Sequence, residues 1–253
     1  MYSPNPLGQM QQMPTTAGAL PNAVAYLRKV YSLFAGGILF AIAGAMVALY
    51  AGTPTAVGEA GGATIALPPI VAFGVEHWIL TFILYIGAFF AASSVRRIPG
   101  VNVAALFGYT FVTGLFIAPS IFFAMLLASQ GATLDPSPVR DAFLLTGAAF
   151  TGLTGYVFVT KKDFSYLGAS LSIGLWVVLG AIILSMFLHS AVLELAIASV
   201  GVLLFAGYIL YDTSRILQDR DEREPVGSAL RLFLDVVNMF LFLLRILSSA
   251  RNR

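Results

Sequence analysis

Apolar residues gather in seven long runs along the chain, separated by short polar segments. The runs cover about residues 30–51, 72–95, 101–129, 141–160, 165–188, 190–213 and 228–248. Each run has about 20 residues or more, the length that an α-helix needs to cross the hydrocarbon core of a bilayer. Transmembrane β-strands would be about ten residues long with alternating polarity. We therefore predict an all-α membrane protein with seven transmembrane helices.

Composition agrees with a membrane domain and narrows the chemistry. Hydrophobic residues make up 58% of the chain and charged residues 10%, with a mean hydropathy of +0.88, whereas a soluble domain is about a quarter charged. The net charge of +2 and the lack of a basic block give no support for nucleic-acid binding. The absence of cysteine excludes disulfides, thiolate metal sites and cysteine nucleophiles.

The two ends of the chain differ from the seven runs. Residues 1–25 are uncharged and rich in Pro, Gln and Met, and they lack the basic and apolar regions of a signal peptide. We expect a disordered N-terminal tail there, a seven-helix membrane domain over residues 26–250 and a short C-terminal tail over 251–253.

Loop charges predict the orientation, because Lys and Arg accumulate on the cytoplasmic side of membrane proteins. With seven spans and an inside N-terminus, one face holds Arg28, Lys29, Arg96, Arg97, Lys161, Lys162, Arg215, Arg220 and Arg223. The opposite face receives Arg140, Arg251 and Arg253. We expect a cytoplasmic N-terminus and an external C-terminus.

Small residues spaced four apart predict close helix packing in lipid, where no hydrophobic drive between helices remains. Such pairs in the fourth and fifth runs are Ala148 with Gly152, Thr151 with Gly155, and Ser170 with Gly174.

The last run carries a polar stripe. Arg231, Asp235, Asn238, Phe242 and Arg245 follow one another at spacings of four, three, four and three residues, which places them on one helical face. Four of the five are polar, so the stripe cannot face lipid. We expect the last helix to be enclosed by the others or to line an aqueous cavity. The candidate pore-lining or plug residues are Arg231, Asn238, Arg245 and Glu76, the last near the outer end of its span.

Two aspartates stand at a similar predicted depth. Asp212 lies about one turn from the cytoplasmic end of the sixth run and Asp235 two turns into the seventh, with Arg96 closing the second. If the two carboxylates meet in a low dielectric, they cannot both stay ionised and must share a proton. Such a pair is a pH-sensitive latch, closed with the proton and repelled open without it. A nearby Arg96 would favour the ionised form.

Two other interpretations of these charges remain open. The two aspartates can act as weak, transit-type metal ligands for Ca²⁺, although calcium prefers six to eight oxygens. They can also form structural ion pairs, Asp212 with Arg215 or Arg96, and Asp235 with Arg231. No resident cofactor is expected.

The residues around both aspartates resemble the signature of the Bax inhibitor family, the transmembrane Bax inhibitor motif proteins. The similarity lies in residues 207–213 (GYILYDT) and 234–245 (LDVVNMFLFLLR). It extends upstream through Thr113-Gly114, Gly155-Tyr156 and residues 161–164 (KKDF), and it covers about residues 22–250. The closing motif is the specific part.

The resemblance implies more than the spacing does. It implies six helices around a buried last helix, and a pH sensor made of Asp212 and Asp235 with Arg96 as the matching arginine. It also implies a bacterial-type member in an inner or plasma membrane, acting as a pH-dependent calcium leak channel. Eukaryotic relatives lower calcium in internal stores and protect against cell death.

One position departs from the family pattern. The family's acidic partner for the last-helix arginine falls about eleven residues before Arg96, where this chain has Leu84-Tyr85-Ile86. Either Glu76, more than two turns further out, substitutes for it, or the contact at Arg245 is built differently. The departure weakens the case for calcium conduction.

Two other functions compete with a channel. An intramembrane aspartyl protease also uses aspartates on adjacent helices, but Asp235 follows Leu232-Phe233-Leu234 instead of Gly-x-Gly, so no enzyme is expected. A non-conducting regulator of a membrane protease or of cell death is the stronger rival, with residues 1–25 as the segment that a partner would bind. His77 and His189 have no HExxH or GxSxG motif around them and are expected to be core or interface residues.

Overall fold

A computed structural model describes residues 19–54, 56–60, 63–129, 134–188, 190–218 and 224–251. Most of the predicted tail, residues 1–18, lies outside the described residues, as do His189 and the end residues 252 and 253. The first helix begins at Ala19, seven residues before the predicted start of the membrane domain at residue 26.

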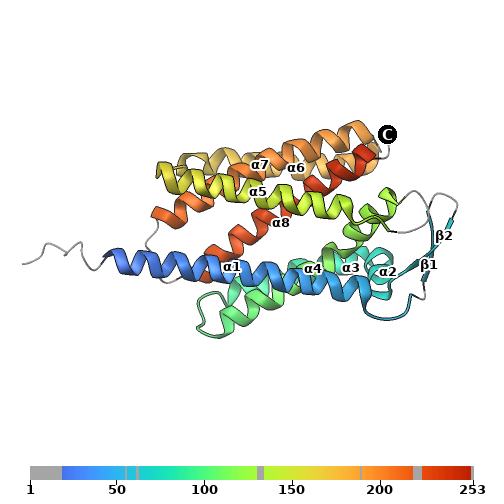
Figure 1. The fold of residues 1–253 in the computed structure, drawn as a ribbon, viewed down its shortest axis with the longest axis horizontal. Helices are drawn as coiled ribbons and strands as arrows, with labels where there is room; N and C mark the ends of the chain where they lie inside the picture. The colour runs from blue at the N-terminus through green and yellow to red at the C-terminus, as the bar shows by residue number, and fades with distance from the viewer. Residues whose placement is uncertain are drawn as a thin grey trace, which may run out of the picture.

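The chain is nearly all helical (Figure 1). In order, its elements are α1 (Ala19–Tyr50), β1 (Ala56–Ala60), β2 (Ala63–Leu67), α2 (Pro69–Glu76), α3 (Trp78–Ser94), α4 (Val101–Ala128), α5 (Ser137–Thr160), a 3-10 turn (Ser165–Leu167), α6 (Gly168–Leu188), α7 (Ala191–Gln218) and α8 (Pro225–Arg251).

The strands correct the all-α prediction. They pair antiparallel, with Ala60 opposite Ala63, in the connection between the first two apolar runs. The sequence between them is Gly61-Gly62, a dipeptide typical of two-residue hairpin connections, since glycine adopts positive φ without strain. The segment was missed because a five-residue strand carries too few residues to show periodicity beside long apolar runs.

The second apolar run is also not one straight helix. It consists of α2 and α3, which meet at His77 with a bend of 97°. Within the described residues, five segments are long and apolar enough to cross a membrane, and six if the bent pair counts as one. The five are Val24–Tyr50, Val101–Ala128, Ser137–Thr160, Ser165–Leu188 and Ala191–Gln218. α8, the predicted seventh span, is not among them.

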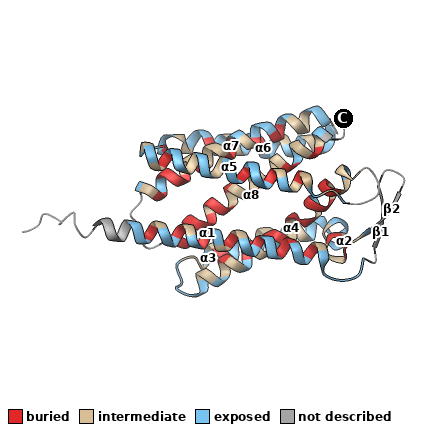
Figure 2. Cartoon of the chain, in the orientation of Figure 1, coloured by how far each residue is buried: buried red, intermediate tan, exposed pale blue. Residues whose placement is uncertain are grey.

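The surface of the helical part is apolar, as a membrane protein requires. Large side chains stand outward, including Trp176 at 76%, Phe187 at 76% and Leu203 at 73% exposure. Figure 2 shows exposed positions along the outward faces of α5, α6 and α7. In water so much exposed apolar surface would cause association, whereas hydrocarbon solvates it. The protein is therefore a multi-pass membrane protein.

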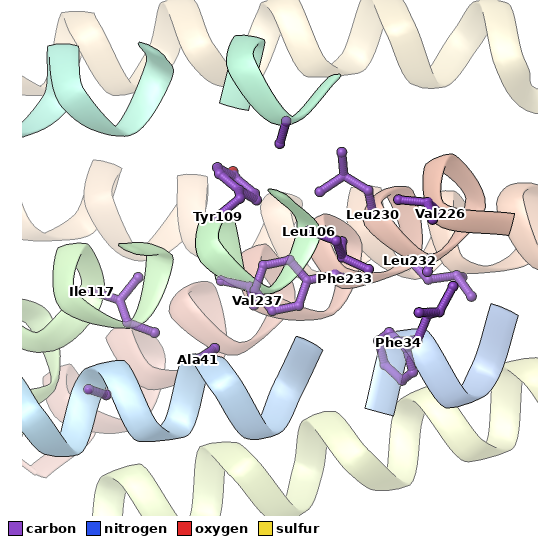
Figure 3. Close-up of a cluster of buried hydrophobic side chains, with 14 of the residues drawn as sticks. Phe34, Ala41, Leu106, Tyr109, Ile117, Val226, Leu230, Leu232, Phe233 and Val237 are labelled. Carbon is purple, nitrogen blue, oxygen red and sulfur yellow. The ribbon is translucent and has the colours of Figure 1, made fainter. Parts of the chain in front are cut away.

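α8 packs against four other helices: α1, α4, α5 and α7. In Figure 1 it runs obliquely between α1 and α4 on one side and α5 and α7 on the other. Its apolar face meets α1 and α4, where Phe233 is fully buried with its ring edge-on to Tyr109 at 6.3 Å between centroids. Figure 3 shows Leu230, Phe233 and Val237 of α8 in one cluster with Leu106 and Tyr109 of α4 and Ala41 of α1.

α1 and α4 approach each other closely at two glycines. A methyl group on Gly114 would collide with the backbone oxygen of Ala41, and one on Gly44 with that of Phe111. Small residues permit such backbone contact, which gains dispersion energy in lipid.

Of the three predicted small-residue pairs, one makes a close helix contact and two do not. A methyl group on Gly152 or Gly155 would meet nothing within 4 Å, so those two pairs make no close contact. Gly174 does pack tightly, because a methyl group on it would lie 2.9 Å from Leu204 Cδ1 of α7. Spacing of small residues alone does not say which face of a helix meets a neighbour.

The glycine contact predicts a stability difference between two substitutions in α4. Gly114→Ala should destabilise the protein by about 2 kcal/mol, because the helices must separate to admit the methyl group. Gly108→Ala is the matched control, since its methyl group would meet nothing within 4 Å and alanine favours helix. Thermal unfolding in detergent checks the pair, and equal melting temperatures for the two variants would contradict the packing.

Candidate functional site

The polar stripe of α8 faces α7 along its whole length. Near one end Arg231 binds Asp212, and toward the other Arg245 binds Glu194. Between them a methyl group on Gly201 would lie 2.6 Å from the ring of Phe242, so this ring fills the space that the glycine leaves. Residue numbers rise on α8 as they fall on α7, so the two helices are antiparallel. Asp235 is buried in this interface, whereas the side chains of Arg231 and Arg245 are 39% and 52% exposed.

Asp212 and Asp235 meet between these two helices. They are 3% and 5% exposed, and their carboxyl groups are close enough to interact electrostatically. A hydrogen bond between two carboxyl groups needs a proton on one of them. The structure therefore brings together the two aspartates that the sequence placed at one depth.

Arg231 supplies the positive charge at this pair. Its Nε donates to Asp212 Oδ1 at 3.1 Å, and its Nη2 donates to Ser228 Oγ at 3.0 Å. Ser228 in turn shares a hydrogen bond of 2.9 Å with the Tyr26 hydroxyl of α1. One aspartate oxygen, Oδ2 of Asp235, is buried without a hydrogen-bond partner in the described structure. With one shared proton, the two carboxyls and Arg231 sum to no net charge.

Arg96 does not occupy the place that the resemblance gave it. Its Nε lies 3.6 Å from Glu224 Oε2, at the start of α8, and Arg97 pairs with the same carboxylate. The hydrogen bond from Arg97 lowers the pKa of Glu224, and the charge of Arg96 adds to the effect. Arg231 reaches Asp212 instead because it precedes Asp235 by one turn on the same face of α8.

Arg96 still lies next to the pair's arginine. A methyl group on Gly227 would be 3.9 Å from both Arg96 Cδ and Arg231 Nη1. A charged group is thus formed by Glu224, Arg96 and Arg231. It lies nearer than the aspartates to the end of the helix bundle where α8 begins.

The contact at Arg245 is built from a residue that the sequence analysis did not consider. Its Nη2 lies 2.7 Å from Glu194 Oε2 of α7, so Glu76, at the end of α2 beside the bend, is not its ion-pair partner. Tyr85, in the segment where the family acid falls, accepts a 2.9 Å hydrogen bond from the hydroxyl of Tyr109. Asn238 donates to the backbone oxygen of Leu234 at 2.8 Å and so binds its own helix.

A spacing signal could have found Glu194. It precedes Asp212 by 18 residues, about five turns at 3.6 residues a turn, which returns to the same helical face. Once Asp212 is paired with the α8 stripe, Glu194 must lie on that stripe too. Glu224 had no such signal, because it stands outside the helix.

Metal binding at the pair finds limited support. Among the described residues, no group of three or more His, Asp or Glu side chains could hold a metal ion.

Comparison with known proteins identifies the family of this chain. Residues 23–252 match the family described as "Inhibitor of apoptosis-promoting Bax1". This chain belongs to the Bax inhibitor family. Both aspartates, all the stripe residues and Glu194 lie inside the matched range.

Relatives of this family come from distant sources. An uncharacterized protein of Campylobacter jejuni is 36% identical over 228 residues, 90% of each chain. Mouse protein lifeguard 4 is 32% identical over 231 residues, 91% of this chain and 87% of its own. The Golgi anti-apoptotic protein of vaccinia virus (strain Lister) is 33% identical over 168 residues, 66% of this chain and 67% of its own.

The buried ion pair predicts a non-additive stability effect. Arg231→Gln should cost about 3 kcal/mol, because it leaves a buried carboxylate without its countercharge. Asp212→Asn combined with Arg231→Gln should recover most of that loss, since no buried charge remains unpaired. Unfolding of the two single variants and the double variant in detergent measures the coupling.

Arg245→Gln is the control for this comparison of single and double variants. Its pair with Glu194 is more exposed, at 52% and 37% of the two side chains, so the loss should stay below about 1 kcal/mol. Strictly additive losses at Arg231 and Asp212 would show that the contact does not stabilise the fold.

Proposed function

We propose that this protein is a pH-sensitive leak pathway for calcium or other cations, gated by the Asp212–Asp235 pair. The observation that carries the proposal is the burial of two aspartates between α7 and α8, one of them paired with an arginine. Charged groups within a membrane are costly and mark ion or proton pathways more often than packing. Membership of the Bax inhibitor family supports the same function.

The proposed gate is the α7–α8 interface. With one shared proton the pair is neutral with Arg231 and the helices stay together. Loss of the proton leaves two anions against one cation, and their repulsion favours separation. The charged and titratable groups around the pair are Arg231 on α8 and Arg215 and Tyr208 on α7. Separation would turn the stripe, now closed against α7, toward a water-filled path.

The proposal includes the arrangement in the membrane. α8 would be the seventh span, enclosed by α1, by the bent α2–α3 unit and by α4 to α7. The buried stripe explains why it resembles the other spans least. The aspartates would lie nearer the cytoplasm, with the N-terminus on the same side and the C-terminus outside. The protein would have no enzymatic activity, and calcium would pass without a resident site.

Cation flux in proteoliposomes tests the gate. Calcium flux should rise about tenfold from about pH 5 to about pH 8, because a single titrating proton controls opening. The Asp212→Asn and Asp235→Asn variants each keep only one carboxyl, so two anions can no longer repel each other at high pH. Their flux should therefore stay near its low-pH level throughout. Absence of flux, or a pH profile that ignores both substitutions, would overturn the proposal.

Asp163→Asn is the matched control for the flux experiment. Asp163 lies in the loop after α5 and is fully exposed, and its hydrogen bonds with Ser165 lower its pKa. It is therefore ionised over the whole range tested, and its replacement should leave the pH profile unchanged.

Cysteine labelling tests the orientation, because the chain has no cysteine of its own. Thr53 lies after α1 and Lys162 after α5, both at exposed positions. Each is replaced by cysteine in turn, as Thr53→Cys and Lys162→Cys. A membrane-impermeant maleimide on intact cells should label Thr53→Cys and leave Lys162→Cys unlabelled until the membrane is opened. The reverse pattern would invert the proposed topology.

A non-conducting regulator is the second candidate. The name of one relative, the Golgi anti-apoptotic protein of vaccinia virus, gives an anti-apoptotic role for that protein. For this chain the partner would be a membrane protease or another membrane protein. Deleting residues 1–18 spares α1 and separates the two candidates: partner control should fail while flux persists.

A further inference from the structure

A groove of about 610 Å³ opens between α1 and α5, on the side of α8 away from the polar stripe. We call it the α1–α5 groove. Its floor is formed by Val236, Val237 and Phe240 of α8 and by Ile117 and Ile121 of α4. Figure 3 shows Val237 and Ile117 facing Ala41 of α1, which also lines it.

The groove is closed at one end and open toward the other. Phe34 of α1 and Phe150 of α5 stack with 4.9 Å between ring centroids and close it. From Phe34 the lining follows α1 to Tyr50 at its C-terminal end, and α5 back to Arg140 in its first turn. The sixteen residue steps from Phe34 to Tyr50 extend about 24 Å along α1. The acyl region of one leaflet is about 15 Å deep, so the groove is long enough to hold an acyl chain of that leaflet.

The lining is apolar except near the open end. Nitrogen and oxygen atoms of side chains come only from Thr146, Tyr50 and Arg140 among the lining residues. Thr146 donates its hydroxyl to the backbone oxygen of Ala142 at 2.7 Å. Water has little to bind in such a space, and the walls are helices that cross the membrane, so the adjacent solvent is hydrocarbon.

The open end offers a charge for a lipid headgroup. The Arg140 side chain is 67% exposed. Two of its nitrogens contact Asp141 Oδ1, at 3.0 and 2.9 Å, while a guanidinium has five donors in all. Tyr50 stands beside it at the helix end, and tyrosine and arginine are typical of the headgroup level of a bilayer.

We propose that the α1–α5 groove is a binding site for one phospholipid, with an acyl chain along α8 and the phosphate at Arg140. The occupant comes from the leaflet on the Arg140 side. The acyl chain covers Val236 and Val237, which directly follow Asp235 in the sequence, and Phe240 about one turn further along α8. The bound lipid therefore supports α8 from the face opposite the aspartate pair, whether or not the protein conducts ions.

The experiment measures phospholipid retained by the purified protein. Native mass spectrometry after incubation with dioleoyl phosphatidylglycerol should find one lipid per chain on the wild type. Gly147→Leu places a side chain on the groove wall, where a methyl group would meet nothing within 4 Å, and should abolish retention. Arg140→Gln keeps the groove but removes charge-assisted hydrogen bonds to phosphate, so affinity should fall about tenfold.

Gly152→Leu is the matched control on the same helix. Its methyl group also meets nothing within 4 Å, but the residue does not line the groove, so lipid retention should equal that of the wild type. Inorganic phosphate should not displace the lipid, because the acyl chain provides most of the contact. Equal retention by the wild type, Gly147→Leu and Arg140→Gln would mean non-specific annular lipid and would overturn the proposal.

Discussion

The contact on which the rest of the structure depends is the ion pair between Asp212 of α7 and Arg231 of α8, at 3.1 Å. Four polar residues on α8 would make the helix unstable in lipid, so another surface must receive them. α7 provides that surface with Asp212 and Glu194 on one face and with Gly201, which admits the ring of Phe242. Because the contact fixes the rotation of α8, it also decides which face of that helix is left to pack with α1 and α4.

That second face is built by ordinary close packing. Phe233 fits against Tyr109 and α1, and the glycine contact between α1 and α4 holds the two helices that receive it. α5 approaches α1 at Phe150 and leaves the α1–α5 groove beyond it. α8 therefore lies between a charged interface on one side and a lipid-accessible apolar groove on the other. A shift of α8 toward either side would change its contacts on both sides.

The arginines show how a family pattern and a particular chain can differ. The pattern assigned Arg96 to the aspartates and an acid on the second span to Arg245. In this protein Arg231 forms the ion pair with Asp212 of the aspartate pair. Arg96 and Arg97 pair with Glu224, and Arg245 pairs with Glu194. Each of these arginines still has a partner of opposite sign, as a low dielectric demands. What has changed is which helices the partners join: both stripe contacts are between α7 and α8, and the second span contributes only its Arg96–Arg97 end.

The sequence by itself determined the membrane class, the helical runs, the shared depth of Asp212 and Asp235, and the stripe of α8. These follow from hydropathy and helical period, which act along the chain and need no knowledge of neighbours. Only the tertiary structure decided which charges pair, because Arg96, Arg215 and Arg231 stand at similar depths and differ in the direction they face. It also decided the bend at His77, the hairpin after α1 and the choice of Gly44 and Gly114 over other small residues. The charge pairs and the glycine contacts depend on distances between segments remote in sequence, which hydropathy and helical period along the chain do not specify. The hairpin and the bend are local, but they are too short to interrupt the hydropathy pattern clearly.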